Sequence, residues 1–303
     1  MPVAPVSPQY GLPGANLSRL THACQVLNPA AVYVEDAVLF REGLGADVLA
    51  GLPVIAAANA RPGDTPLERL YAAAGVEPTA APEDHAKYLL TSGSTGLPKA
   101  VICTHQAMAA NASQITACFE ADAPPVLVPS APWSHSLGAN AILHYGLHRG
   151  GTLYIDAGQP VAGRFGETIR NLKEIAPTYQ NMVPAAWMLF AEALEQDDDL
   201  ARTFFSRVRL LQYGGAALGQ AYADRIQAVA VRTVGERISF GSGYGATETG
   251  PTASNVHWPN ARMGLMGLPL PGTSVRLLPE AGKLEFRVKG PQITAGYLNQ
   301  PEL

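Results

Sequence analysis

A run of small and hydroxylated residues between two apolar stretches has the chemistry of a polyphosphate site. The run reads YLLTSGSTGLPKAV over residues 88–101. Its glycines let backbone amides approach an anion, its hydroxyl groups donate hydrogen bonds, and its lysine supplies a mobile positive charge. A flexible surface loop is the competing interpretation for a Gly/Ser run taken alone. The residues that would bind phosphate are Thr91, Ser92, Gly93, Ser94, Thr95, Gly96 and Lys99.

The spacing in this run differs from that of the Walker phosphate loop. The Walker loop has four residues between its two glycines and a serine or threonine directly after its lysine. Here two residues separate Gly93 from Gly96, and Ala100 follows Lys99. We therefore expect a phosphate loop of a different kind.

Two further glycine-rich segments each follow a β-rich run. The run RLLQ leads into YGGAAL at residues 213–218, where small side chains leave room for a flat ring to lie on the backbone. An ordinary tight connection is the competing interpretation there. The run RISF leads into GSGYGATETG at residues 241–250. This second segment fits the spacing of a dinucleotide fingerprint, but the helix-forming run that the fingerprint requires does not follow it.

His135 stands in the segment APWSHSLG at residues 131–138. Taken alone, a histidine beside Trp133 is more typical of a hydrogen-bonded structural residue than of a catalytic one. Ser134, His135 and the acids at 197–199 include the residue types of a hydrolase triad, but no GxSxG nucleophile elbow accompanies them. The sequence therefore argues against a hydrolase.

In their order along the chain, these four segments resemble the motifs of the acyl-adenylate-forming superfamily. This superfamily contains acyl-CoA synthetases, firefly luciferases and the adenylation domains of peptide synthetases. The segment GKLEFRVKGPQITAGY at residues 282–297 is similar to a strand and Gly-Tyr segment in its small β subdomain. Ala100 departs from the family pattern, which usually has glycine there. The resemblance is weak before residue 84 and corresponds to the middle of a family member.

The resemblance implies a role for each motif. The first loop would hold the phosphates of ATP, with Lys99 on the pyrophosphate portion, and His135 would line or gate an acyl channel. Glu248 would hold Mg2+, for which a carboxylate is a suitable hard ligand. The implied catalytic residues are Lys99, His135, Thr247 and Glu248. The implied nucleotide-binding residues, besides those of the first loop, are Gly214, Gly215, Ala216, Tyr244, Gly245 and Thr247.

Two family features are missing after the small β segment. In the family, a Thr-Gly-Asp stretch binds the ribose hydroxyls, and a C-terminal domain carries a catalytic lysine. The last aspartate of this sequence is Asp224, and the only lysines after Glu248 are Lys283 and Lys289. We therefore expect the C-terminal catalytic domain to be absent and the chain to be impaired on its own.

The elements that must position these motifs are predicted to be of the α/β class. From Tyr88 onward, β-rich runs alternate with helical patterns such as those at 165–175 and 221–234. This order predicts parallel-sheet subdomains with flanking helices. We expect the remainder of a first α/β subdomain at 1–84, a nucleotide-binding α/β subdomain at 85–263 and the start of a small β subdomain at 264–303.

The composition limits the partners. The chain has 303 residues, of which 47% are hydrophobic and 15% charged, as in globular proteins. A net charge of -4 with scattered Lys and Arg gives no basic stripe for a nucleic acid. The three cysteines form no CxxC pair, and the longest apolar stretch is too short to span a bilayer. We therefore expect a cytoplasmic protein without nucleic-acid or membrane partners, disulfides or zinc.

By resemblance, the chain would use ATP and Mg2+ to convert a carboxylic acid to an acyl-adenylate and then, with coenzyme A, to a thioester. The segment PWSHSLGAN lacks an acid to pair with an amino-acid ammonium, which favours an uncharged acyl or aryl acid. The segments at 144–160 and 167–187 most resemble the feruloyl-CoA synthetase branch, which favours a hydroxycinnamate. The alternatives are a nucleotide-binding module without turnover and a fragment that self-associates through exposed strand edges.

Overall fold

The structure is a computed structural model that describes residues 1–92, 97–119, 123–300 and 302. The chain forms two compact units. Unit 1 contains Met1–Thr104 and Ala295–Leu303, and unit 2 contains His105–Thr294. The subdomain boundaries expected at residues 84 and 263 rest on motifs rather than on compactness, and they stay a prediction.

The first part of unit 1 is a small parallel sheet. Strand β1 (Val32–Asp36) pairs in parallel with β2 (Val54–Ala58), and β2 pairs with β3 (Thr65–Pro66). Buried apolar side chains of this sheet pack against Cys24 of α1 (Ser18–Leu27). The short elements around the sheet are η1 (Pro8–Tyr10), α2 (Arg41–Leu44), η2 (Asp47–Leu49) and α3 (Glu68–Tyr71).

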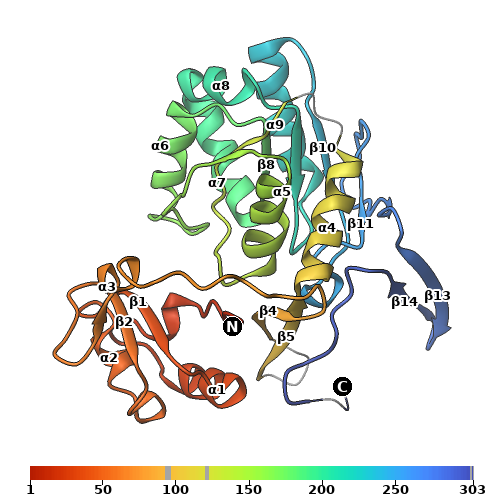
Figure 1. The fold of residues 1–303 in the computed structure, drawn as a ribbon. Helices are drawn as coiled ribbons and strands as arrows, with labels where there is room; N and C mark the ends of the chain where they lie inside the picture. The colour runs from red at the N-terminus through yellow and green to blue at the C-terminus, as the bar shows by residue number, and fades with distance from the viewer. Residues whose placement is uncertain (93–96, 120–122, 301, 303) are drawn as a thin grey trace. The chain divides into compact units, whose positions relative to one another are not determined.

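A hairpin forms the second part of unit 1 (Figure 1). Strands β4 (His85–Ser92) and β5 (Pro98–Thr104) are antiparallel, so the phosphate run connects neighbouring antiparallel strands rather than leading into a crossover helix. Ala100 to Cys103 are buried in β5. Residues 296–298 lie along β5, because the Ile102 amide donates to the Gly296 carbonyl at 3.0 Å and the Leu298 amide donates to the Ala100 carbonyl at 2.9 Å.

A parallel sheet forms the centre of unit 2. Strands β8 (Tyr179–Met182), β9 (Leu210–Tyr213) and β10 (Ser239–Ser242) are parallel, with β9 in the middle. Strand β6 (Val126–Leu127) pairs in parallel with β7 (Thr152–Leu153) and lies beside the start of β8, where the Thr178 amide donates to the Val126 carbonyl at 3.0 Å. The predicted α/β class with parallel sheets and flanking helices is confirmed.

One face of this sheet packs against a large aromatic core. Leu211 and Tyr213 of β9 join this core, and the Phe190 and Phe204 rings meet there at 4.7 Å. Trp187 is fully buried and its indole Nε1 donates to the Gln212 carbonyl at 2.8 Å, which ties a helix to β9. The helices on this face are α6 (Gly166–Glu174), α7 (Pro184–Gln196), α8 (Asp198–Phe205) and α9 (Gln220–Val234).

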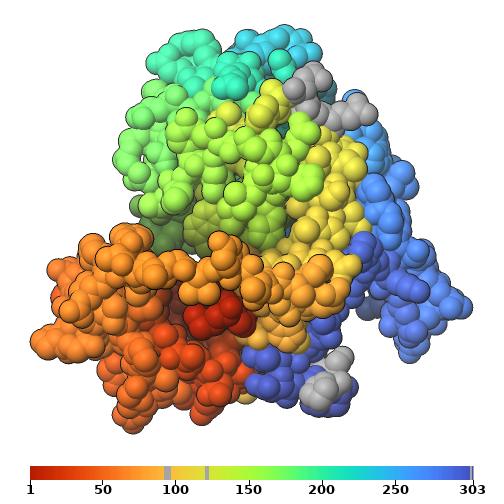
Figure 2. Space-filling view, viewed as in Figure 1, coloured from red at the N-terminus to blue at the C-terminus, as the bar shows by residue number. Residues whose placement is uncertain are grey.

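The opposite face of the sheet is covered by α4 (His105–Cys118), the π-helix η3 (Leu137–Ile142) and α5 (Leu143–His148). Three rings pack together beneath them, with centroids 5.4 to 5.9 Å apart, and they belong to Phe119, Tyr145 and Tyr179. In the space-filling view, yellow and yellow-green atoms of this region hide the strands behind them (Figure 2).

The last part of unit 2 is antiparallel. Strands β11 (Ser254–Asn255) and β12 (Leu268–Pro269) form one pair, and β13 (Ser274–Glu280) and β14 (Lys283–Lys289) form a hairpin. This hairpin lies within residues 264–303, where the sequence predicts β structure. The Gln114 amide of α4 anchors the segment by donating to the Pro271 carbonyl at 2.8 Å and to Gln292 Oε1 at 3.2 Å.

The cysteines are buried, and the helices can be compared with the length needed to cross a membrane. Cys24, Cys103 and Cys118 are all buried, and burial raises the pKa of the Cys24 and Cys118 thiols. No helix in the part of the chain that the structure describes has the length and apolar character needed to cross a bilayer.

The aromatic core predicts a large cost for cavity formation. We expect Phe190→Ala to lower the free energy of unfolding of unit 2 by about 3–5 kcal/mol, because a fully buried ring is removed. The matched control Leu284→Ala, at a side chain 60% exposed, should change it by less than about 0.5 kcal/mol. Denaturant unfolding followed by tryptophan fluorescence measures this, since all three tryptophans lie in unit 2. A loss below about 1 kcal/mol for Phe190→Ala would contradict the packing described.

Candidate functional site

Lys99 lies near the start of β5 in unit 1. It pairs across the hairpin with Thr91, and its Nζ lies 5.0 Å from the centroid of the Tyr297 ring. A cation held over an aromatic ring gains about 0.5–1 kcal/mol at an exposed site. The hairpin and the 296–298 segment thus hold the lysine at the end of the phosphate run. Gly93, Ser94, Thr95, Gly96 and the side chain of Ser92 lie outside the described residues.

Gly214, Gly215 and Ala216 follow the carboxyl end of β9 in unit 2. The Gly214 amide donates to the Met182 carbonyl at 3.3 Å, so the segment starts from the edge shared by β8 and β9. Gly215 and Ala216 are exposed, and Gly215 has a φ of +83°, which favours glycine. The backbone here is open to a ring from solvent, while Leu218 is buried and anchors the segment.

The segment Tyr244–Glu248 follows the carboxyl end of β10. It leads into the 3-10 turn η4 (Thr247–Thr249), and the Ala246 amide donates to Thr249 Oγ1 at 2.8 Å. Residues 251–256 fold back onto it: the Tyr244 carbonyl accepts from the Ala253 amide at 2.9 Å. A Cβ at Gly245 would lie 1.7 Å from the Pro251 carbonyl oxygen, so only glycine fits there.

The Tyr244 ring is held on one side only. It meets Phe286 of β14 at 4.7 Å between centroids with an interplanar angle of 62°, and 38% of the residue remains exposed. An edge-to-face contact fixes the ring without covering both of its faces. The ring can therefore still receive a second planar group.

A hydrogen bond connects the Thr247 turn to the His135 segment. Thr247 Oγ1 donates to Ser136 Oγ at 3.3 Å, and Ser136 is only 3% exposed. The residue after Ser136 also faces the β9 segment, since a Cβ at Gly214 would lie 3.9 Å from Leu137 Cδ1. Unit 2 therefore brings together three of the motifs that the sequence predicts: those around His135, Gly214 and Thr247.

The chain turns sharply around His135. A Cβ at Gly138 would lie 2.6 Å from the Pro132 carbonyl oxygen, so the turn requires glycine. The Leu137 amide donates to His135 Nδ1 at 3.2 Å, which assigns the ring proton of the neutral form to Nε2. The residue is exposed by surface area, yet the protein around the imidazole partly removes it from water, and this lowers its pKa. His135 is therefore a neutral hydrogen-bonding side chain near pH 7.

Glu248 is the candidate magnesium ligand. It lies on η4, its side chain is partly exposed, and its carbonyl accepts from the Thr294 amide at 2.9 Å. The described residues contain no group of three or more His, Cys, Asp or Glu side chains that could hold a metal. Mg2+ at nucleotide sites is commonly bound by one or two carboxylates together with substrate phosphates, so a single carboxylate fits it. The metal role of Glu248 stays a prediction.

The acids at 197–199 have structural roles. Asp197 Oδ1 caps α8 by accepting from the Asp199 and Leu200 amides at 3.0 Å. Its other oxygen pairs with Lys173 Nζ at 2.6 Å, and this bond is the main reason that the pKa of Asp197 is lowered. Asp198 pairs with Arg232 and Asp199 with Arg202. These ion pairs agree with the expectation that these acids do not serve a hydrolase triad.

Three contacts near the predicted residues were not found from the sequence. They are the Ser136 hydroxyl on Thr247, the Tyr297 ring under Lys99 and the Phe286 ring against Tyr244. Tyr297 and Phe286 both lie in the segment interpreted as structural. A hydroxyl beside His135 and aromatic residues in that segment were the available signals, but nothing in the sequence paired them.

Curated proteins of known activity are similar to this chain in sequence. The chain is 30% identical over 240 residues to a long-chain-fatty-acid–CoA ligase of Escherichia coli, covering 75% of this chain and 40% of the relative. It is 29% identical over 242 residues to 4-coumarate–CoA ligase 2 of Narcissus pseudonarcissus, covering 73% and 40%. The chain thus spans about two fifths of the length of these curated relatives.

Solved structures share the fold over nearly the whole chain. VinN in complex with L-aspartate has a TM-score of 0.74 at 27% identity, covering 96% of this chain and 70% of that one. A malonyl-CoA ligase with methylmalonyl-CoA and AMP bound has a TM-score of 0.63 at 26% identity, covering 99% and 73%. The fold and the motifs after β9 and β10 therefore define a protein with the large-domain fold of adenylate-forming enzymes.

A family model that matches almost the whole chain shows which family this protein belongs to. The family model described as AMP-binding enzyme matches residues 3–298, and the chain belongs to this family.

The environment of His135 predicts its titration. We expect a pKa below the ordinary 6.5, because the neutral ring is favoured by burial and by the Leu137 amide on Nδ1. A histidine pKa lowered by folding gives stability that is complete above pH 6.5 and is lost as pH falls through that value. NMR titration of 15N-labelled histidine, assigned with His135→Gln, measures both the pKa and the Nε2–H tautomer. A midpoint at or above 6.5 would contradict this environment.

The close approach at Gly245 predicts strain on substitution. We expect Gly245→Ala to lower the free energy of unfolding of unit 2 by about 1–3 kcal/mol, because the added methyl meets the Pro251 carbonyl. The control Gly166→Ala places its methyl in open space at the start of α6 and should leave stability equal or slightly higher. Equal stabilities for the two variants, measured by denaturant unfolding, would show that residues 251–256 do not pack as described.

Proposed function

We propose that this chain activates a carboxylic acid with ATP, forming an acyl-adenylate and pyrophosphate, and that the acyl group then passes to coenzyme A. The observation that carries this proposal is the hydrogen bond between Thr247 and Ser136. It joins the segment expected to contact phosphate to the segment expected to line the acid channel. A carboxylate and an α-phosphate must meet in the first half-reaction, and this contact supports their meeting here.

The first half-reaction needs an oriented acid and a stabilised polyphosphate. A carboxylate oxygen attacks the α-phosphorus, the bond to the bridging oxygen breaks, and pyrophosphate leaves with its negative charge. Lys99 and the Thr247 hydroxyl would stabilise that charge, as fixed donors and cations do in acyl and phosphoryl transfer. When bound, Mg2+ on Glu248 would further offset the charge of the phosphates.

The second half-reaction transfers the acyl group. The thiol sulfur of coenzyme A attacks the acyl carbon and loses its proton to solvent, the bond to the AMP oxygen breaks, and AMP leaves. His135, neutral near pH 7, would line the channel and donate a hydrogen bond from Nε2 rather than carry a charge. Gly214, Gly215 and Ala216 would hold the adenine, with Tyr244 next to it.

The acid is proposed to be an uncharged aryl or acyl acid, with a hydroxycinnamate as the first choice. The segment around His135 contains no acid that could pair with an amino-acid ammonium. Relatives named for long-chain fatty acids and for 4-coumarate support this class. The likeness to VinN, solved with L-aspartate, makes an amino acid the competing choice.

A nucleotide-binding module without turnover is the second candidate. It is favoured by the length of the match, because the chain spans about two fifths of each curated relative. A cytoplasmic location and self-association of the chain both stay predictions.

Pyrophosphate release by the purified chain tests this function. With ATP, Mg2+ and a panel of ferulate, coumarate, benzoate, medium-chain fatty acids and L-aspartate, we expect release that depends on an uncharged acid. Lys99→Ala and Glu248→Ala should each lower the rate at least about 100-fold, because each removes charge stabilisation in the first step. The controls Lys283→Ala and Glu280→Ala remove exposed charges of the β13–β14 hairpin and should leave the rate unchanged.

Three outcomes would separate the candidates. Acid-dependent release with the expected variant losses supports acid activation. ATP binding in a titration, without release for any acid, supports the module without turnover. Release that persists in both Lys99→Ala and Glu248→Ala contradicts the residue roles.

A further inference from the structure

Strand β8 has an unusual composition for its position. Its residues are Tyr179, Gln180, Asn181 and Met182, all buried, although a buried strand of a parallel sheet is usually a run of Val, Ile and Leu. Gln180 is 1% exposed and Asn181 8% exposed. Buried amides in such a strand are more informative than exposed apolar residues, because they are retained against a desolvation cost.

A chain of hydrogen bonds fixes the orientation of the Asn181 amide. Asn181 Nδ2 donates to the Tyr179 hydroxyl at 2.9 Å, and this hydroxyl donates to Gln212 Oε1 at 3.1 Å. Gln212 Nε2 in turn donates to Asn255 Oδ1 at 2.5 Å and faces the Val256 carbonyl at 3.4 Å. Because a carbonyl only accepts, each amide in this chain has its nitrogen and oxygen assigned.

At the Asn181 end of this hydrogen-bond network, one acceptor has no donor in the residues that the structure describes. Asn181 Oδ1 is buried and has no hydrogen-bond partner among the described residues. The neighbouring Gln180 Nε2 donates to the Val128 carbonyl at 3.0 Å, and its Oε1 also lacks a partner within the described part of the chain. A buried acceptor without a donor is unfavourable, so both oxygens would be stabilised by a donor that the described residues do not supply.

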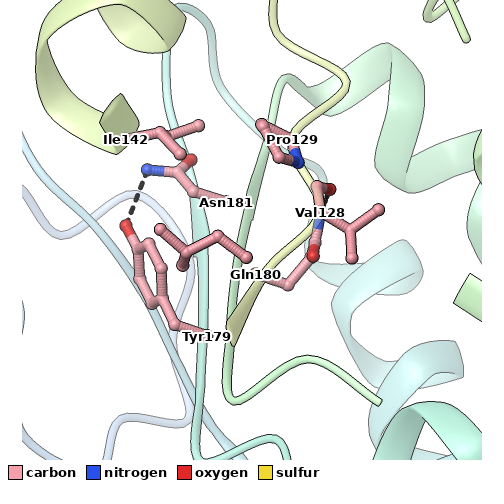
Figure 3. A pocket seen from close by; sticks show the side chains of 7 residues that line it. Val128, Pro129, Ile142, Tyr179, Gln180 and Asn181 are labelled. Carbon is pink, nitrogen blue, oxygen red and sulfur yellow. Dashed lines mark hydrogen bonds between the residues drawn. The ribbon is translucent and has the colours of Figure 1, made fainter. Parts of the chain in front are cut away.

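Gln180 and Asn181 are among the residues that line a small pocket of unit 2. Its empty space is about 150 Å3, part of it open to solvent, and it is lined by Leu127, Val128, Pro129, Ile142, Tyr179, Gln180 and Asn181. Figure 3 shows the Asn181 amide next to Ile142, with its nitrogen turned toward Tyr179. In this structure the space is too narrow to hold even a water molecule, so the side chains that line it must move before one end of a substrate can enter.

The pocket is connected to the candidate site by a single short element. Ile142 is the last residue of the π-helix η3, which begins at Leu137, directly after Ser136. Ser136 contacts Thr247, and Leu137 faces Gly214. π-helical turns occur frequently at functional sites. The segment that would line the acid channel therefore leads directly to the two amides.

We propose that Asn181, with Gln180 beside it, selects acids that carry a hydrogen-bond donor at the end remote from the carboxylate. This inference rests on the proposed function and narrows its substrate class. A phenolic or alcoholic hydroxyl would donate to Asn181 Oδ1. A plain alkyl chain or an ether oxygen would leave this oxygen without a donor. Hydroxylated aromatic acids are thus preferred to fatty acids.

Three acids that differ at one position test the proposal. Coumarate has a ring hydroxyl, cinnamate has hydrogen there, and 4-methoxycinnamate has an oxygen that cannot donate. For the 303-residue chain we expect coumarate to bind at least tenfold more tightly than the other two, measured by titration calorimetry, with pyrophosphate release as a second readout. The Asn181→Leu variant should bind all three acids with about equal affinity, mainly because its binding of coumarate is weakened.

Two variants keep the test specific. Gln227→Leu is the matched control, because Gln227 is also a buried amide of unit 2 but bonds to Ile238 and does not line the pocket. It should keep the full preference for coumarate. Gln180→Met should reduce the preference less than Asn181→Leu. Thermal unfolding of each variant establishes that it is folded.

Each remaining outcome overturns the proposal. Two results would show that the Asn181 amide does not bind the hydroxyl: equal affinity of the chain for all three acids, or an equal loss of affinity for all three in Asn181→Leu. The proposed function would stand in either case. The proposal also fails if Gln180→Met loses the preference for coumarate and Asn181→Leu keeps it, since Asn181 is then not the acceptor. If no acid of the function panel is bound or activated, the proposed function fails and this inference fails with it.

Discussion

The contact of residues 251–256 with the segment after β10 constrains the candidate site of unit 2. It is a contact between two backbones, which glycines at 241, 243 and 245 permit because a side chain at any of these positions would meet a carbonyl oxygen of the returning segment. With the returning segment in place, Tyr244 is turned toward Phe286 and Thr247 toward Ser136. The geometry of the motif thus depends on the absence of side chains at three positions, which lets the two backbones come close enough to form hydrogen bonds such as that from the Ala253 amide to the Tyr244 carbonyl.

Much of the fold followed from local patterns. The helices expected at 165–175 and 221–234 correspond closely to α6 and α9, and the β-rich runs RLLQ and RISF contain most of β9 and the first half of β10. The hairpin of β4 and β5 was not anticipated, because two apolar runs joined by a glycine-rich loop do not reveal their pairing. The π-helix at 137–142 was missed because its sequence differs in no recognisable way from that of an α-helix.

The candidate site was also predicted only in part from the sequence. Motif order gave His135, Gly214 and Thr247 their expected roles, and in unit 2 the segments around them contact one another. The polar strand at 179–182 was visible in the sequence, yet it was used only as evidence of resemblance. Its meaning depends on burial and on the direction of each amide, which distant residues such as Gln212 and Val256 determine. No spacing rule connects those positions.

The composition of unit 1 from two distant stretches has a consequence for biosynthesis. The outer edge of β5 pairs with residues 296–298, while all of unit 2 lies between them in sequence. A ribosome adds roughly 5–20 residues per second, so β5 waits on the order of ten seconds or more for its partner. During that interval the nascent chain carries an unpaired strand edge, which is a template for intermolecular pairing. Unit 2, being continuous, meets no such delay, and slower translation would prolong the exposure of β5 alone.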